Sequence, residues 1–125
     1  MNGFLGCLGH GEDELGRFRA ACAHEGAGQA TPHERAWLRG SPEQVATWPG
    51  GALVLWGEPL VHEGAELVRA DAARVATLWR EHGADALPRL DGRFALAVVE
   101  GGPEPRAWLA TDPLGLEPLV YAADA

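Results

Sequence analysis

The clearest hydrophobic pattern along the chain lies between residues 71 and 83. Three apolar residues and one histidine recur there at three- and four-residue spacing, which is typical of one face of a helix: Val75, Leu78, Trp79 and His82. Asp71 precedes the pattern and is a favoured N-cap residue, and Gly83 follows it and is a favoured end for a helix. The sequence therefore predicts an amphipathic helix that begins after Asp71 and ends at Gly83.

Most of the remaining apolar residues fall in short runs separated by glycine and proline, a pattern typical of strands joined by tight turns. The runs are 2–8, 33–39, 44–48, 52–56, 93–100, 106–111 and 117–122. A further helix is expected over about 13–22. The runs 93–100 and 106–111 flank a Gly-Gly-Pro-Glu-Pro loop and predict a hairpin. No linker or repeat interrupts the pattern, so we expect one α+β domain over residues 1–125, with mostly antiparallel strands.

Charge narrows the choice of partners. The formal net charge is −8, and the ten basic residues, all arginine, form no run. Nucleic acid is therefore not an expected partner, because binding to a phosphate backbone requires a basic surface. No stretch reaches the roughly 20 apolar residues that span a bilayer, and the N-terminus lacks a signal-peptide pattern. We expect no membrane contact and a cytoplasmic location.

Several kinds of chemistry are excluded by composition. The chain has no lysine, which excludes Schiff-base chemistry and a phosphate-loop lysine, and its single serine, Ser41, lies in a Gly-Ser-Pro turn. The five histidines show no metal-ligand spacing, so neither a metal nor another cofactor is expected. Cys7 and Cys22 lack CxxC spacing and are interpreted as reduced, buried thiols.

The C-terminal third carries the most specific pattern, LDGRFALAVVEGGPEPRAWLATDPLGLEPLVYA. This stretch resembles the asparagine synthetase-like class II glutamine amidotransferase domain, and the start MNGFLGCLG is similar to that family's MCGIxGxx. The matching residues of the C-terminal pattern are Leu90, Gly92, Phe94, Ala95, Ala97, Asp112, Gly115, Pro118, Leu119 and Tyr121.

The resemblance implies an αββα sandwich of the N-terminal-nucleophile hydrolase type. Members of this family hydrolyse glutamine and pass the ammonia to an ATP-using synthetase domain. Here the chain stops soon after the Pro-Leu-Val-Tyr stretch, so the expected fold is truncated at its C-terminal end and the synthetase domain is absent. An unpaired sheet edge would invite association.

Two departures from the family pattern bear on catalysis. The nucleophilic cysteine of the family is matched by Asn2, whose carboxamide is no nucleophile. The asparagine that helps to form the family's oxyanion hole is matched by Trp56, and losing one such donor costs about 10²–10³ in rate. The resemblance therefore predicts that no catalytic residue remains.

The substrate-binding part of the pattern is partly retained. The resemblance assigns the glutamine carboxylate to Arg35, the amine to Asp71, and the remaining contacts to Gly57 and Glu58 of the Trp-Gly-Glu stretch. Structural roles are the alternative: Arg35 as a solvated strand residue and Asp71 as a helix cap alone.

Three functions follow. The first is a catalytically silent domain that serves as a structural or regulatory subunit. Its partner would be a separately encoded asparagine synthetase-like, ATP-dependent amide-forming enzyme, comparable to peptide-modifying relatives such as lasso peptide cyclases, or a second copy of this chain. The second is a module that binds glutamine, or a peptide, without turnover. The third is an active glutaminase that uses an unforeseen nucleophile such as Cys7.

Overall fold

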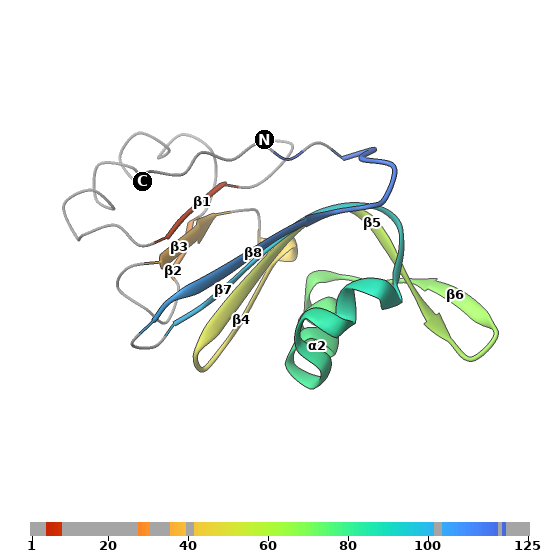
Figure 1. Cartoon of the computed structure of the whole chain (residues 1–125), viewed down its shortest axis with the longest axis horizontal. Coiled ribbons are helices and arrows are strands. Elements are labelled where there is room, and N and C mark those ends of the chain that lie inside the picture. Colours follow the sequence, from red (N-terminus) through yellow and green to blue (C-terminus); the bar gives the residue numbers. More distant parts are fainter. Residues whose placement is uncertain are drawn as a thin grey trace.

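The computed structural model describes residues 5–8, 28–30, 36–39, 42–101, 104–117 and 119. It is an α+β fold built on a five-stranded antiparallel sheet in the order β4-β5-β7-β8, with β6 paired to β5 (Figure 1). These strands are β4 (Val45–Trp48), β5 (Gly51–Glu63), β6 (Glu66–Arg69), β7 (Leu90–Glu100) and β8 (Arg106–Thr111). A short 3₁₀ helix, η1 (Pro42–Gln44), precedes β4.

A second, three-stranded antiparallel sheet has the order β1-β3-β2. Its strands are β1 (Leu5–Leu8), β2 (Gly28–Ala30) and β3 (Ala36–Arg39). Strand β3 approaches β5 and β7, whereas the helix α2 (Ala72–His82) approaches β4 and β5. Figure 1 shows the small sheet and the helix on opposite sides of the five-stranded sheet, so the layers are helix, sheet and sheet.

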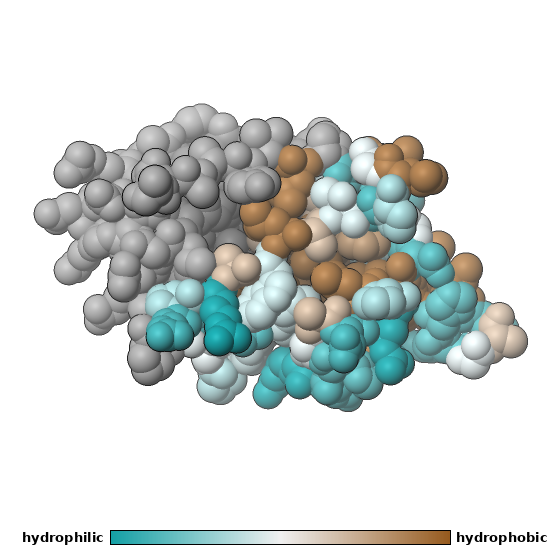
Figure 2. All heavy atoms as spheres, in the orientation of Figure 1, coloured by the Kyte–Doolittle hydropathy of each residue, from teal (hydrophilic) through white to brown (hydrophobic). Residues whose placement is uncertain are grey.

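The helix forms where the sequence predicts it. Asp71 is the N-cap, and its Oδ1 accepts a hydrogen bond of 2.8 Å from the backbone N–H of Arg74. Gly83 ends the helix with φ 60°, and its N–H is bonded to the carbonyl of Trp79. The buried face carries Val75, Leu78 and Trp79, as the spacing predicts. Figure 2 shows a hydrophilic outer surface over α2, at the lower edge of the view.

Apolar side chains fill both faces of the five-stranded sheet. On the helix side, Val75 and Trp79 pack with Leu53, Leu96 and Val98. On the other side, alternate residues of the same strands form a smaller buried cluster: Ala52, Val54, Ala97 and Val99. Successive side chains of a strand point to opposite faces of the sheet, so the same strands contribute residues to both cores. Trp79 adds an edge-on contact with Trp108, at a centroid separation of 5.1 Å.

The predicted hairpin between residues 93–100 and 106–111 is confirmed as β7 and β8, joined by residues 101–105. Two predictions need correction. The run 52–56 is only part of β5, which continues to Glu63 and turns through Gly64 into β6, a strand that the pattern does not predict. The strand expected over 117–122 begins at Glu117, which lies in a bend, and most of it falls outside the described residues, as does the helix expected over 13–22.

Candidate functional site

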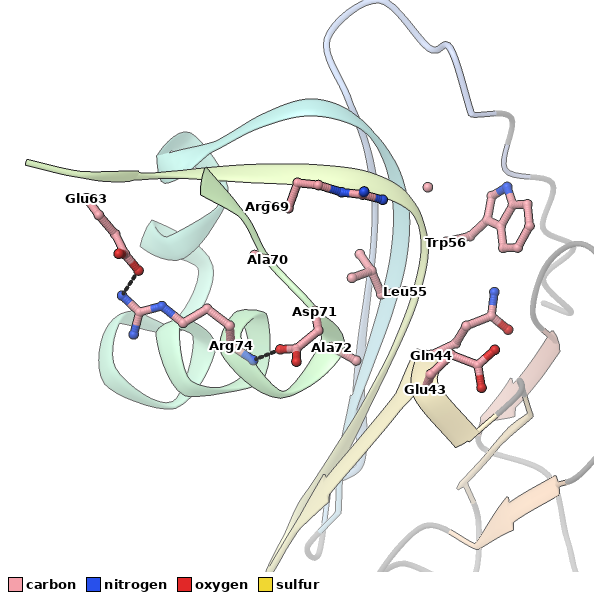
Figure 3. Close-up of a pocket in the computed structure, with 11 residues that line it drawn as sticks. Glu43, Gln44, Leu55, Trp56, Glu63, Arg69, Ala70, Asp71, Ala72 and Arg74 are labelled. Atoms are coloured by element: carbon pink, nitrogen blue, oxygen red, sulfur yellow. Dashed lines mark hydrogen bonds and ion pairs between the residues drawn. The ribbon is translucent and has the colours of Figure 1, made fainter. Parts of the chain in front are cut away.

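A pocket of about 710 Å³ opens where β5 meets the N-terminal end of α2 (Figure 3). Strand β5 is bonded to β7 along residues 51–61, but on its other side it pairs with β4 over 51–54 and with β6 over 60–63. Residues 55–59 therefore lie in a gap between these two partners within the described part of the sheet. Leu55, Trp56 and Gly57 line the pocket from this gap.

The opposite side of the pocket comes from the segment that links β6 to α2. Arg69, Ala70 and Asp71 line it, together with Ala72 and Arg74 of the helix. A backbone hydrogen bond of 3.0 Å from Ala70 to the carbonyl of Pro59 fixes this segment against β5. Glu43 and Gln44 of η1 and Glu63 of β5 complete the lining. The pocket volume lies within the range of roughly 300–1,000 Å³ that is usual for small-molecule sites.

Gly57 is required by the backbone at the pocket. Its φ is 105°, a region that residues with a side chain rarely adopt. A Cβ at this position would collide with the carbonyl oxygen of Arg93 and lie 3.0 Å from the Cα of Phe94 on the neighbouring strand. The glycine therefore has a structural role whatever the pocket binds.

Trp56 has its polar atom turned away from the pocket. The indole Nε1 donates a hydrogen bond of 2.8 Å to Oε2 of Glu117, a residue that is 9% exposed and is not among the pocket lining. Because an indole has a single donor, this bond uses the only hydrogen that Trp56 could offer to a ligand.

Ion pairs connect Trp56 to the far wall of the pocket. Glu117 Oε1 lies 3.6 Å from Arg93 Nη1, and Arg93 Nη2 lies 3.6 Å from Glu58 Oε2. Glu58 Oε1 in turn accepts a hydrogen bond of 2.9 Å from Nη2 of Arg69. This chain of four charged residues links Trp56 to Arg69, and in Figure 3 the Arg69 side chain extends toward the part of β5 from which Trp56 projects.

Asp112 stabilises the turn that places Glu117 beside Trp56. Its buried carboxylate accepts hydrogen bonds from four backbone N–H groups: Phe94, Leu114, Leu116 and Glu117. Burial acts to raise the pKa of the Asp112 carboxyl, but the four donors outweigh it, and the pKa lies below its ordinary value of 3.8. Asp112 is therefore charged in the folded protein at neutral pH.

Of the four substrate-binding residues predicted from the sequence, two line the pocket. Gly57 and Asp71 are brought together there. Glu58 is not part of the lining and instead pairs with Arg69 and Arg93. Arg35, like Asn2, lies outside the described residues. Cys7 is in β1, at the position paired with Trp37 of β3, so its backbone nitrogen is part of a strand and not a free amine.

Several lining residues were missed by the sequence reasoning. Glu43, Gln44 and Arg74 belong to no family motif, and Arg69 comes from a strand that was not predicted. Arg74 also pairs with Glu63, at 3.6 Å. In residues 42–101 and 104–117, no group of three or more histidine, cysteine or carboxylate side chains is arranged to hold a metal ion, and no helix is long and apolar enough to cross a membrane.

Comparison with known proteins gives one finding. Residues 58–125, more than half of the chain, match the model of the glutamine amidotransferase domain. The matched region covers the four charged residues Glu58, Arg69, Arg93 and Glu117 and the helix α2. No curated protein matches the chain, and no solved structure does.

Proposed function

Because the chain belongs to the glutamine amidotransferase domain family, we propose that it is a catalytically silent member that serves as a structural or regulatory subunit. Its partner in this proposal is a separately encoded asparagine synthetase-like enzyme of the cytoplasm that forms amide bonds with ATP. By analogy with the peptide-modifying relatives, the substrate of that enzyme is a peptide. The main support for the lack of catalytic activity is one observation: the indole N–H of Trp56 is bonded to Glu117.

The chemistry behind this observation is the need for an oxyanion hole. Hydrolysis of a carboxamide develops negative charge on the carbonyl oxygen, and fixed donors must be aimed at that oxygen. At the position that matches the family's asparagine, the only side-chain donor is already bonded to a carboxylate. Asn2 adds the second deficiency, since a carboxamide supplies no nucleophile.

The layered architecture supports the finer assignment of the fold. Three layers, α2, the five-stranded sheet and the three-stranded sheet, follow one another as they would in an αββα sandwich of the N-terminal-nucleophile hydrolase type. We propose that the fold is this sandwich, with a second helical layer beyond the small sheet. A crystal structure that placed no helix over the face of the small sheet that points away from the five-stranded sheet would contradict it.

Catalytic silence is tested by measuring glutamate and ammonia release from glutamine by the purified protein. We expect no release above background and a retained Met1 in the intact mass, because a residue as large as Asn2 hinders removal of the initiator methionine. Turnover by the natural protein would refute the proposal and make Cys7 the first residue to replace.

A pair of matched variants sharpens this test. Asn2→Cys with Trp56→Asn restores both the thiol and the donor, whereas Asn2→Ala with Trp56→Asn restores the donor alone. Measurable release from the first variant and none from the second would show that the scaffold supports glutamine hydrolysis once its two missing groups return.

The subunit role is tested by co-purification of the tagged protein from its native cells, followed by light scattering of the purified chain. We expect a synthetase-like protein in the complex, or a dimer if the partner is a second copy. Recovery of the protein alone, as a monodisperse monomer, would contradict the subunit role.

A second function, amino-acid binding without turnover, is favoured by the pocket itself, which retains Gly57 and Asp71 in its lining. On the assignment that the family resemblance gives, calorimetry with glutamine should then show a binding signal that Arg35→Ala removes. Arg89→Ala is the matched control, because Arg89 is exposed and does not line the pocket. Equal affinities for the two variants would exclude Arg35 from the site.

A further inference from the structure

Trp56 presents carbon, and not its donor, to the pocket. Trp56 is one of the residues that line the pocket, and its Nε1 is bonded at 2.8 Å to Glu117, which is not one of them. Figure 3 shows the ring nitrogen on the side of the ring away from Gln44. The wall that Trp56 contributes is therefore an apolar aromatic surface.

Charged groups on the other walls supply polarity. Arg69 lines the pocket with a side chain that is 75% exposed, and in the described part of the chain it gives one hydrogen bond, from Nη2 to Glu58. A guanidinium has five N–H donors, so donors remain for a ligand. Asp71 uses Oδ1 to cap the helix, and Oδ2 makes no bond among the described residues.

We propose that this pocket binds an α-amino acid with an aromatic side chain in preference to glutamine. The ligand ring packs against Trp56, its carboxylate pairs with Arg69, and its ammonium group pairs with Asp71. The proposal rests on the amino-acid-binding function given above and specifies its ligand class. Arg69 takes a role that the family resemblance assigns to Arg35.

Physical reasons favour the aromatic side chain over the carboxamide. A carboxamide placed against the indole loses hydrogen bonds to water and gains no donor from Trp56 in return, because the Nε1 hydrogen is already in use. An aromatic ring in the same place loses no hydrogen bond and gains offset or edge contacts with the indole. The pocket, at about 710 Å³, has the volume for a ligand of this size.

Glu117 is the positioning residue for this wall. It is 9% exposed, it accepts the Trp56 hydrogen bond, and it lies 3.6 Å from Arg93, which orients its carboxylate. Without this acceptor, the indole is free to adopt other rotamers, and its N–H becomes available to a ligand. Glu117 therefore determines both the position and the polarity of the wall without contacting the ligand.

The first experiment compares L-phenylalanine, L-phenylalaninamide and L-glutamine by calorimetry on the full chain. We expect L-phenylalanine to bind about tenfold more tightly than L-glutamine. L-Phenylalaninamide, which lacks the carboxylate, should bind more weakly, and Arg69→Ala should remove the difference between L-phenylalanine and its amide. Glutamine binding as tightly as phenylalanine would overturn the proposal, and binding of neither would overturn it together with the amino-acid-binding function.

Variants separate positioning from folding. Trp56→Asn should reverse the preference toward glutamine, and Glu117→Ala should weaken phenylalanine binding, whereas Glu117→Gln, which keeps an acceptor, should have a smaller effect.

The indole N–H resonance of Trp56 in a ¹⁵N spectrum should shift in Glu117→Ala, while that of Trp79, which is bonded to Glu100, stays in place. An unmoved Trp56 resonance, or unchanged phenylalanine affinity in Glu117→Ala, would overturn the positioning role. If Glu117→Ala fails to fold, the affinities of Glu117→Gln and Trp56→Asn for phenylalanine and glutamine test the proposal instead.

Discussion

At the scale of single residues, Gly57 sets how closely β5 and β7 approach beside the pocket. Its φ of 105° and its contact with the backbone of β7 leave no room for a side chain. Gly64, in the β5–β6 turn, also has a positive φ, of 64°, but nothing lies within 4 Å of a Cβ placed there. The two glycines therefore separate the effect of conformation from that of crowding.

This pair gives a prediction for stability. Gly64→Ala should lower the free energy of unfolding by about 1 kcal/mol, the usual effect of a left-handed conformation on a residue with a side chain. Gly57→Ala should lower it by roughly 3 kcal/mol, because backbone atoms of β7 must also move. Urea denaturation of the two variants measures the difference. Equal losses would mean that the strands separate at Gly57 with little loss of stability.

At the scale of elements, prediction from sequence succeeds where the determinants are local. The helix 72–82 has its cap, its apolar spacing and its final glycine within one short stretch. Strand β5 is longer than the predicted run 52–56 because pairing with β7 along residues 51–61 stabilises an extended backbone through Gly57 and Pro59. The Trp56–Glu117 bond joins residues 61 positions apart, and no spacing rule reaches that far.

The helix N-terminus yields a prediction about Asp71. Asp71→Ala should lower the free energy of unfolding by about 1 kcal/mol, because the bond to the Arg74 N–H is lost. Asp71→Asn keeps an acceptor and should be nearly neutral. If the carboxylate also binds a ligand ammonium group, calorimetry should show the same loss of affinity in both variants. Full binding by Asp71→Asn would leave the cap as the only role of this residue.

Asp112, in the turn after β8, should make the stability of the folded protein depend on pH in the acidic range. The pKa of Asp112 is lowered in the folded protein, so the stability that this group contributes is present above its unfolded value, near 3.8, and is lost as pH falls through the folded pKa. Asp112→Asn places an amide among four N–H donors and should lower the melting temperature at pH 7. The gap between variant and natural protein should narrow below about pH 4. A gap that is constant between pH 7 and pH 3 would contradict this account.

At the scale of the whole molecule, the five-stranded sheet is a shared wall between two cores. Val98 faces the helix side and Val54 faces the small sheet, and both side chains are 0% exposed. The second core is buried because β3 lies across β5 and β7. The sequence indicates antiparallel strands and one domain, but the assembly of the strands into two sheets depends on contacts between distant segments, which local patterns do not encode.

Truncation of one valine on each face tests this arrangement. Val54→Ala and Val98→Ala should each lower the free energy of unfolding by about 2 kcal/mol, because each removes buried methyl groups and leaves a cavity. Thr111→Ala, at an exposed position of β8, should change it by less than about 0.5 kcal/mol. A near-neutral Val54→Ala would mean that the small sheet does not cover this face in solution. Thermal or urea unfolding supplies the measurement.

The gap in the pairing of β5, between β4 and β6, has a consequence for the evolution of this protein. Along residues 55–59, alternate peptide groups point away from β7 toward the pocket side of the strand. A mutation replaces a side chain but leaves the peptide groups in place. A lineage can therefore lose the nucleophile and the oxyanion donor and still inherit a pocket that main-chain polar groups line along one edge. Selection can then adapt that pocket to a new ligand by exchanging a few of the side chains that line it. A family can in this way acquire new specificities more readily than new folds.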